Sequence, residues 1–281
     1  ETIELKRCVD FLSAAIGEVI SDGASTAVLE TTHKLMNSVR QVLSAASGDF
    51  DRWDRLNQVK EAYRVEISST MSSEVILVAK DEISRLLNEM NGILTDGIER
   101  AIDENDGQLP SYFVNEARDY ERLDTRTQYG LPSVRVKTFT HRPLPMFLEA
   151  PARYMKTLNG KKAEALHASV KASGIYDEGL GMYKTSESLE EETMEIGRIR
   201  AFTAGWLERE SVFLHMTYKY LLSLLSAGLY ESYFEAIKTN MVPFLDPEVY
   251  GRPITENSSF IASSVNPNPE VVGQGFVARL S

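Results

Sequence analysis

The sequence has few of the side chains that disulfides, metal sites and nucleophilic enzymes require. Its 281 residues contain a single cysteine, Cys8, so an internal disulfide is excluded. Cys8 shares an apolar helical face with Phe11 and Leu12, which predicts a buried, inert thiol and a reducing, cytoplasmic setting. The four histidines are His33, His141, His167 and His215. They show no paired spacing such as H-x-x-x-H, so we expect no metal site.

The sequence also lacks the usual patterns of nucleotide binding, serine catalysis and membrane insertion. Neither G-x-x-x-x-G-K-[ST], G-x-G-x-x-G nor G-x-S-x-G occurs. The longest apolar run, around 218–229, is interrupted by Lys219 and Ser223, and is too short to span a bilayer. A formal net charge of -11 disfavours nucleic acid and anionic membrane surfaces as partners. Any phosphate site must therefore be built locally.

The most frequent pattern in the sequence is the residue spacing of an amphipathic helix. Apolar residues recur every three or four positions over three N-terminal segments, 5–19, 27–46 and 75–102. The first hundred residues are therefore predicted to be all-helical, with a break at Ser47-Gly48-Asp49, where Asp49 or Asp51 caps the next helix. A polar loop is expected at 104–110.

The second half of the sequence is predicted to contain more helices around one irregular region. Residues 111–145 carry short alternation and a Gly-Leu-Pro turn at 130–132, which fits either a strand pair or an irregular loop. Helical periodicity returns over four segments, 147–158, 161–172, 211–225 and 230–241. Aromatic and aliphatic residues in the last forty positions predict an ordered end with a short helix at 258–264. We expect antiparallel helices with functional loops at one end.

Carboxylates and aromatic residues are the remaining side chains suited to catalysis or ligand binding, and carbohydrate enzymes use both. Tyr112, Phe113, Glu116 and Tyr120 lie close together in the sequence. They either line a sugar cleft, by stacking and hydrogen bonding, or belong to a core beside a loop.

Residues 196–215 carry the most specific pattern, IGRIRAFTAGWLERESVFLH. It resembles the IGR-x-x-x-F-x-PGW-KENG-x-x-x-H element of the inverting glycoside phosphorylases of glycoside hydrolase family 94, the cellobiose phosphorylase group. The resemblance implies that Trp206 and Glu208 contact sugar and that His215 holds phosphate. Ala204 replaces the family's proline, and Leu207 replaces a lysine that contacts the acceptor sugar. On spacing alone, the favoured interpretation of His215 is a histidine on the face of an ordinary helix.

Three other segments extend the resemblance. Residues 48–57 are similar to the family's G-D-W-N-D-x-x-N element, which implies that Asp54 is the general acid, with Asp51 as the second candidate. The alternative is that these aspartates only start a charged helix. The end of the chain, GFVARLS, resembles the approach to a W-L-T-G-T loop, which implies that the Ser281 hydroxyl binds phosphate. Glu256 matches an acidic position and is expected to contact sugar.

The resemblance implies an all-α fold, with residues 1–281 forming part of one (α/α)6-barrel catalytic domain, a six-hairpin toroid. An N-terminal β-sandwich and both ends of the barrel would lie outside the chain, which is then expected to be inactive alone. The implied reaction is inverting phosphorolysis of a β-linked gluco-oligosaccharide to α-glucose 1-phosphate. It uses inorganic phosphate as co-substrate, with no metal or organic cofactor, and the family is commonly homodimeric. A non-catalytic glycan-binding toroid, a helical scaffold and the C-terminal domain of a cyclic β-1,2-glucan synthase remain alternatives.

Overall fold

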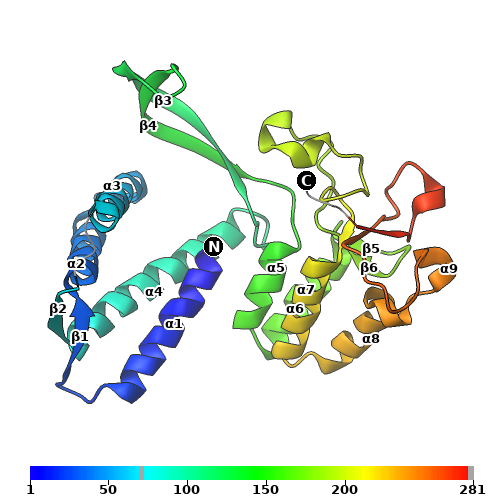
Figure 1. Ribbon diagram of the computed structural model, residues 1–281, viewed down its shortest axis with the longest axis horizontal. Helices are drawn as coiled ribbons and strands as arrows, with labels where there is room; N and C mark the ends of the chain where they lie inside the picture. Colours follow the sequence, from blue (N-terminus) through cyan, green and yellow to red (C-terminus); the bar gives the residue numbers. More distant parts are fainter. Residues whose placement is uncertain (70–72, 278–281) are drawn as a thin grey trace. The chain divides into compact units, whose positions relative to one another are not determined.

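The computed structural model describes residues 1–69 and 73–277 and divides the chain into two compact units, Glu1–Glu99 and Arg100–Ser281 (Figure 1). The fold is mixed: 52% of it is helical and 18% is strand, with four small antiparallel sheets. The prediction of an all-α (α/α)6 barrel is therefore wrong. The segments that form strands have apolar patterns too short to be distinguished from those of a helix. Their conformation is determined by pairing with strands distant in the sequence.

The N-terminal unit alternates helices with two short strands. Its elements in order are α1 (Thr2–Val19), β1 (Ser25–Leu29), α2 (Glu30–Ala45), α3 (Asp49–Ser69), β2 (Val75–Ala79) and α4 (Lys80–Asp103), which ends just inside the second unit. The predicted helix at 5–19 and the break at 47–49 are confirmed. The prediction of helix at 27–29 and 75–79 is wrong, because β1 and β2 pair antiparallel there, from Ser25 opposite Ala79 to Leu29 opposite Val75.

A small aliphatic core holds the N-terminal unit together. Val9, Val78, Ile83 and Leu87 are buried in one cluster. Cys8 precedes Val9 on α1 but is exposed, so the prediction of a buried thiol is wrong. Successive helical residues differ by about 100° in direction, and the side chain that faces the core here is Val9.

A long β-hairpin follows the 104–110 loop in the C-terminal unit. β3 (Phe113–Arg126) pairs antiparallel with β4 (Pro132–Pro143), so the strand-pair alternative is confirmed. At the tip, the Gly130 N–H donates to the Thr127 carbonyl at 2.9 Å, and Gly130 has φ +78°. Glycine tolerates this left-handed conformation without steric cost.

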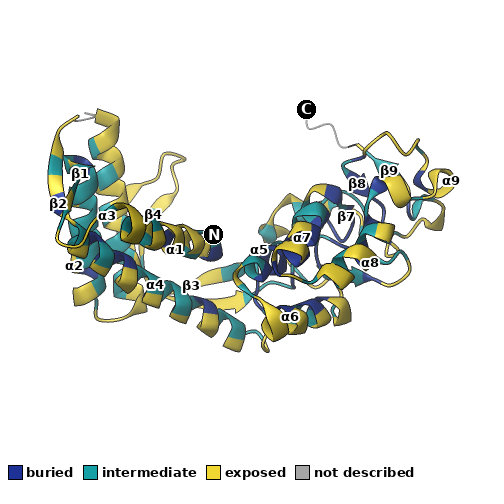
Figure 2. Ribbon diagram, turned by 90° about the horizontal axis from the view of Figure 1, so that it is seen from below, coloured by how far each residue is buried: buried dark blue, intermediate teal, exposed yellow. Residues whose placement is uncertain are grey.

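Helices supply the main core of the C-terminal unit. They are α5 (Glu149–Tyr154), the short 3-10 helix η1 (Met155–Thr157), α6 (Gly160–Ala172), α7 (Leu214–Ser226) and α8 (Tyr230–Asn240). All four predicted helical segments of this half are confirmed to within a few residues. Met155, Ile175, Tyr183, Tyr220 and Leu224 are buried between these elements. Figure 2 shows the buried positions concentrated along α5 and α7.

Short elements connect these helices and build a small sheet. They are β5 (Tyr176–Asp177), β6 (Met182–Tyr183), η2 (Met194–Ile196), η3 (Arg198–Ala201), β7 (Val212–Phe213), η4 (Val242–Phe244), α9 (Pro247–Tyr250), β8 (Phe260–Ile261), η5 (Pro269–Val271) and β9 (Gly275–Phe276). β8 is the middle strand of a three-stranded sheet with β7 and β9. The predicted helix at 258–264 is wrong, since Phe260 and Ile261 pair with strands distant in the sequence. Among the described helices, none has the length and apolar character of a membrane span.

Candidate functional site

The loop at 205–211 leads from the Thr-Ala-Gly-Trp turn into β7 and has an unusual backbone. The Trp206 N–H donates to the Thr203 carbonyl at 3.1 Å. Gly205 has φ +71°, Leu207 has φ +52° and Glu210 has φ +55°. A non-glycine residue in the left-handed region is uncommon and costs conformational energy, and such residues persist where the surroundings fix them. The loop is therefore held in one conformation by contacts elsewhere.

Arg209 supplies those contacts from a buried position. Its Nε donates to the Glu210 carboxylate at 3.3 Å, and its Nη1 donates to the carbonyls of Arg200 and Phe202 at 3.1 and 3.0 Å. Its Nη2 donates to Glu190, and Arg209 and then Arg200 hold the pKa of that carboxyl below its usual value. One guanidinium thus fastens the 205–211 loop to the segment 190–202.

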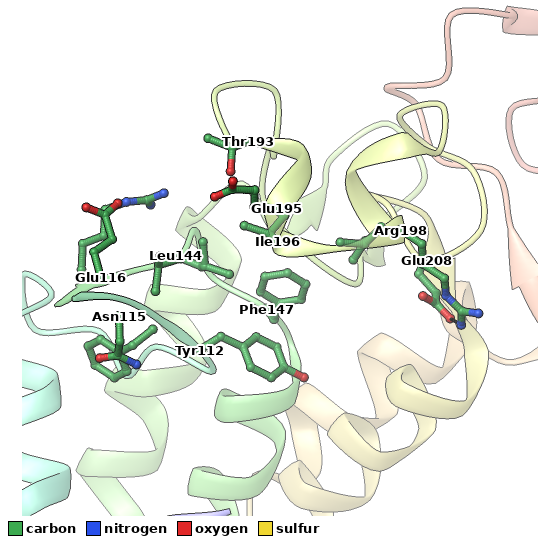
Figure 3. A pocket seen from close by; sticks show the side chains of 14 residues that line it. Tyr112, Asn115, Glu116, Leu144, Phe147, Thr193, Glu195, Ile196, Arg198 and Glu208 are labelled. Carbon is green, nitrogen blue, oxygen red and sulfur yellow. Dashed lines mark hydrogen bonds and ion pairs between the residues drawn. The ribbon is translucent and has the colours of Figure 1, made fainter. Parts of the chain in front are cut away.

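A cavity of about 690 Å³ lies beside this segment, at the base of the hairpin (Figure 3). Its volume is within the range of about 300–1,000 Å³ that is typical of small-molecule sites. The lining residues are Tyr112, Phe113, Val114, Asn115, Glu116, Arg142, Leu144, Phe147, Thr193, Glu195, Ile196, Arg198, Ile199 and Glu208. We call this cavity the hairpin pocket.

Ion pairs fix charged groups around the hairpin pocket. The Arg198 Nη2 donates to the Glu208 Oε1 at 2.7 Å. Arg142 donates through both terminal nitrogens to Glu192, at 2.8 and 2.6 Å. That hydrogen-bonded pairing lowers the pKa of Glu192 and raises the pKa of Arg142. The geometry presents Glu208 from the motif loop as an oriented acceptor in the pocket wall.

An aromatic wall completes the hairpin pocket. The rings of Tyr112 and Phe147 are perpendicular, with centroids 5.1 Å apart. The Tyr112 hydroxyl donates to the Glu149 Oε2 at 2.6 Å. Burial raises the pKa of Glu149, but hydrogen bonds from Tyr112 and Arg153 outweigh it, so the pKa lies below its usual value. The pocket therefore combines aromatic surface with carboxylates and guanidinium groups.

His215 and Trp206 lie outside this lining but belong to one ladder of aromatic rings across β7, β8 and β9. His215 is exposed in the first turn of α7, and its ring stacks on Phe213 with centroids 5.6 Å apart. Phe213 stacks on Phe260 at 4.6 Å, Phe260 on Phe276 at 5.5 Å, and Phe276 on Trp206 at 3.7 Å. The sheet thus connects the two motif residues through three phenylalanines.

Glu256 takes part in a local contact. Its carboxylate accepts from the Arg252 Nη1, and its carbonyl accepts from the Tyr250 hydroxyl at 3.3 Å. The lining of the hairpin pocket does not include Glu256. Ser281, the other predicted phosphate ligand, lies outside the described residues.

The two candidate acids, Asp51 and Asp54, lie on α3 of the N-terminal unit. Asp51 accepts from the Ser47 N–H at 3.0 Å and lies 3.6 Å from Arg55. The Ser47 hydrogen bond is the main cause that lowers the pKa of Asp51. Asp54 accepts from the Gln58 Nε2 at 2.8 Å. Asp51 therefore binds a backbone N–H of the segment that precedes α3, not one of the helix's own first N–H groups.

Some of the residues singled out in the sequence line the hairpin pocket, and others do not. Tyr112, Phe113 and Glu116 line it with Glu208, whereas Tyr120 lies farther along β3 and is not in the lining. Arg198 was not among the predicted site residues, although the Ile-Gly-Arg triplet of the motif contains it. Three further lining residues were not predicted, because no local sequence pattern marks them: Arg142, Phe147 and Glu195.

No protein-family model matches the chain, and the comparison with curated proteins finds no match. Within residues 1–69 and 73–277, no three His, Cys, Asp or Glu side chains gather as metal ligands would. The resemblance to glycoside phosphorylases therefore stays a prediction from the motif residues.

Proposed function

We propose that the chain belongs to an enzyme that cleaves a β-linked gluco-oligosaccharide by inverting phosphorolysis, with inorganic phosphate as co-substrate. The observation that carries the proposal is the position of Glu208. The residue that the motif resemblance assigns to sugar binding lines an aromatic, carboxylate-rich pocket and is oriented there by Arg198. Aromatic faces and hydrogen-bonding carboxylates together suit sugar rings, which carry apolar faces and hydroxyl edges.

In this reaction a phosphate oxygen forms a bond to the anomeric carbon while the glycosidic carbon–oxygen bond breaks. One carboxylic acid protonates the leaving oxygen, and phosphate replaces the activated water of an inverting hydrolase. Asp54 is the proposed acid, with Asp51 as the second candidate. His215 and Ser281 are proposed to hold phosphate, and Trp206 and Glu256 to add sugar contacts. The product is α-glucose 1-phosphate.

The setting proposed for this activity is the cytoplasm, since the single cysteine allows no internal disulfide. A homodimer is proposed on the motif resemblance. No metal or organic cofactor is needed, because phosphate is itself a competent nucleophile and the acid step requires only a carboxyl group.

The test combines binding and turnover on one panel of β-1,2-, β-1,3- and β-1,4-linked gluco-oligosaccharides. Calorimetry measures the affinity for each sugar and for inorganic phosphate separately. We expect Glu208→Gln to weaken oligosaccharide binding about tenfold and to leave phosphate binding unchanged, because one charged acceptor becomes neutral. His215→Ala should do the reverse. Glu191→Gln, at an exposed carboxylate outside the pocket lining, is the matched control. Absence of oligosaccharide binding by the unmodified chain would refute the proposal.

A non-catalytic glycan-binding protein is the second candidate, and the contacts of α3 favour it. Asp51 and Asp54 both have partners on their own helix or at its start, Ser47 and Gln58. Release of glucose 1-phosphate by the full-length protein separates the two candidates. Turnover that Asp54→Asn abolishes while oligosaccharide affinity persists supports the enzyme. Binding without turnover on every sugar supports the second candidate.

A further inference from the structure

We infer that Tyr112 is a stacking platform for one glucosyl unit in the hairpin pocket. This inference rests on the proposed function and names the subsite that the function leaves open. The main determinant of sugar affinity then lies at the start of the hairpin, and not in the motif loop.

Two contacts fix the orientation of the Tyr112 ring before any ligand arrives. Its hydroxyl donates to Glu149 at 2.6 Å, and Arg153 holds the other oxygen of that carboxylate, with its Nε and Nη2 at 3.0 and 2.8 Å. The perpendicular ring of Phe147 packs beside it at 5.1 Å. Tyr112 nevertheless remains 45% exposed and lines the pocket. A large aromatic surface that is already ordered loses little conformational entropy when it binds.

Carboxylates that can accept hydrogen bonds from sugar hydroxyl groups lie at opposite ends of the hairpin pocket. In Figure 3, Glu116 and Glu208 lie on opposite sides of the Tyr112 and Phe147 rings. A β-linked glucosyl ring has equatorial hydroxyl groups around its edge and axial C–H groups on its faces. When one unit lies over Tyr112, the neighbouring units of an oligosaccharide extend toward these carboxylates, which accept hydrogen bonds. The Arg198 Nη2 donates to the Glu208 Oε1 at 2.7 Å and so keeps that carboxylate oriented.

The experiment measures the affinity of the full chain for a gluco-oligosaccharide by calorimetry, and the chemical shifts of sugar protons by NMR. Tyr112→Ala and Tyr112→Leu should each weaken binding at least tenfold, since both remove the aromatic face. Leucine keeps apolar volume and protects the test against a local collapse. Tyr112→Phe retains the ring but loses the anchor to Glu149, so a smaller loss is expected. Tyr120→Ala, at an exposed tyrosine on β3 but outside the lining, should bind as the unmodified chain does.

NMR supplies a readout that a purely structural role would not change. Protons on the sugar face should shift upfield on binding to the unmodified chain, because they lie over an aromatic ring, and the shift should disappear in Tyr112→Leu. Equal oligosaccharide affinity in the unmodified chain, Tyr112→Ala and Tyr112→Leu would overturn the platform and leave the proposed function standing. Absence of oligosaccharide binding by the unmodified chain would instead remove the proposed function itself, and the platform with it.

Discussion

His167 is a titratable side chain in the core of the C-terminal unit, with only 9% of its surface exposed. Its Nδ1 lies 2.9 Å from the Tyr220 hydroxyl. Burial, assisted by the positive charge of Lys171, lowers the pKa of His167. Burial also raises the pKa of Tyr220, so the phenol stays protonated and donates to a neutral imidazole.

This arrangement predicts a loss of stability in mild acid. An unfolded histidine titrates near pH 6.5, and the folded one titrates lower, so as the pH falls below about 6.5 the unfolded state takes up the proton first. The free energy of unfolding should then decrease, by up to about 1.4 kcal/mol per pH unit, until the folded pKa is reached. His167→Gln keeps an acceptor for Tyr220 but does not titrate. Urea unfolding between pH 5 and 8 should show a flatter profile in this variant, and parallel profiles would contradict the assignment.

Cys8 leads to a second prediction at this scale. Because its side chain is exposed on α1, it should react with a maleimide in the folded chain at about the rate of an unfolded thiol. Mass spectrometry of native and urea-unfolded samples gives the two rates, with Cys8→Ser as the blank. Protection of more than a hundredfold in the native chain would instead indicate the buried thiol that the sequence predicts.

Among the elements, the turn before Glu208 depends on a glycine for two reasons. Gly205 has φ +71°, and a Cβ at this position would meet the backbone nitrogen of Asn266 at 2.7 Å. Gly205→Ala should therefore lower the free energy of unfolding by about 2–4 kcal/mol, of which about 1 kcal/mol is the backbone term. Gly251→Ala is the matched control, since Gly251 has φ +75° but no heavy atom within 4 Å of the added Cβ. Thermal unfolding of both variants isolates the clash, and equal losses would show that Asn266 yields.

The same elements show how far the sequence determines the fold. The helix over 214–226 and the break before Asp49 were predictable, because periodicity and capping are local signals. Phe260 and Ile261 were not, since their strand exists only through pairing with Val212, Phe213 and the distant 275–276 segment. The residues of the hairpin pocket also differ in whether a local sequence signal marks them. Tyr112 and Glu208 had sequence signals, whereas Phe147 reaches the pocket only through the fold.

On the scale of the whole molecule, each compact unit has its own core. The N-terminal core is a cluster of aliphatic residues around Val9 and Val78, in a unit that also exposes Phe11 at 71% and Leu77 at 77%. The C-terminal core contains large aromatic side chains that are fully buried, including Tyr183 and Tyr220. Since buried apolar area is the main source of stability, we expect the C-terminal unit to be the more stable of the two.

A pair of cavity variants tests this division. Leu224→Ala, at a residue with 0% exposure, should lower the free energy of unfolding by about 2–5 kcal/mol. Val78→Ala, at a residue with 2% exposure, should lower it by about 2 kcal/mol, because the substitution removes two buried methyl groups. Hydrogen exchange with mass spectrometry locates each loss. Leu224→Ala should speed exchange in α5, α7 and α8 and leave α1 and α4 as they were, and Val78→Ala should do the opposite. If either variant speeds exchange equally throughout both sets of helices, the chain unfolds as one cooperative body, and the separate cores do not act as separate units of stability.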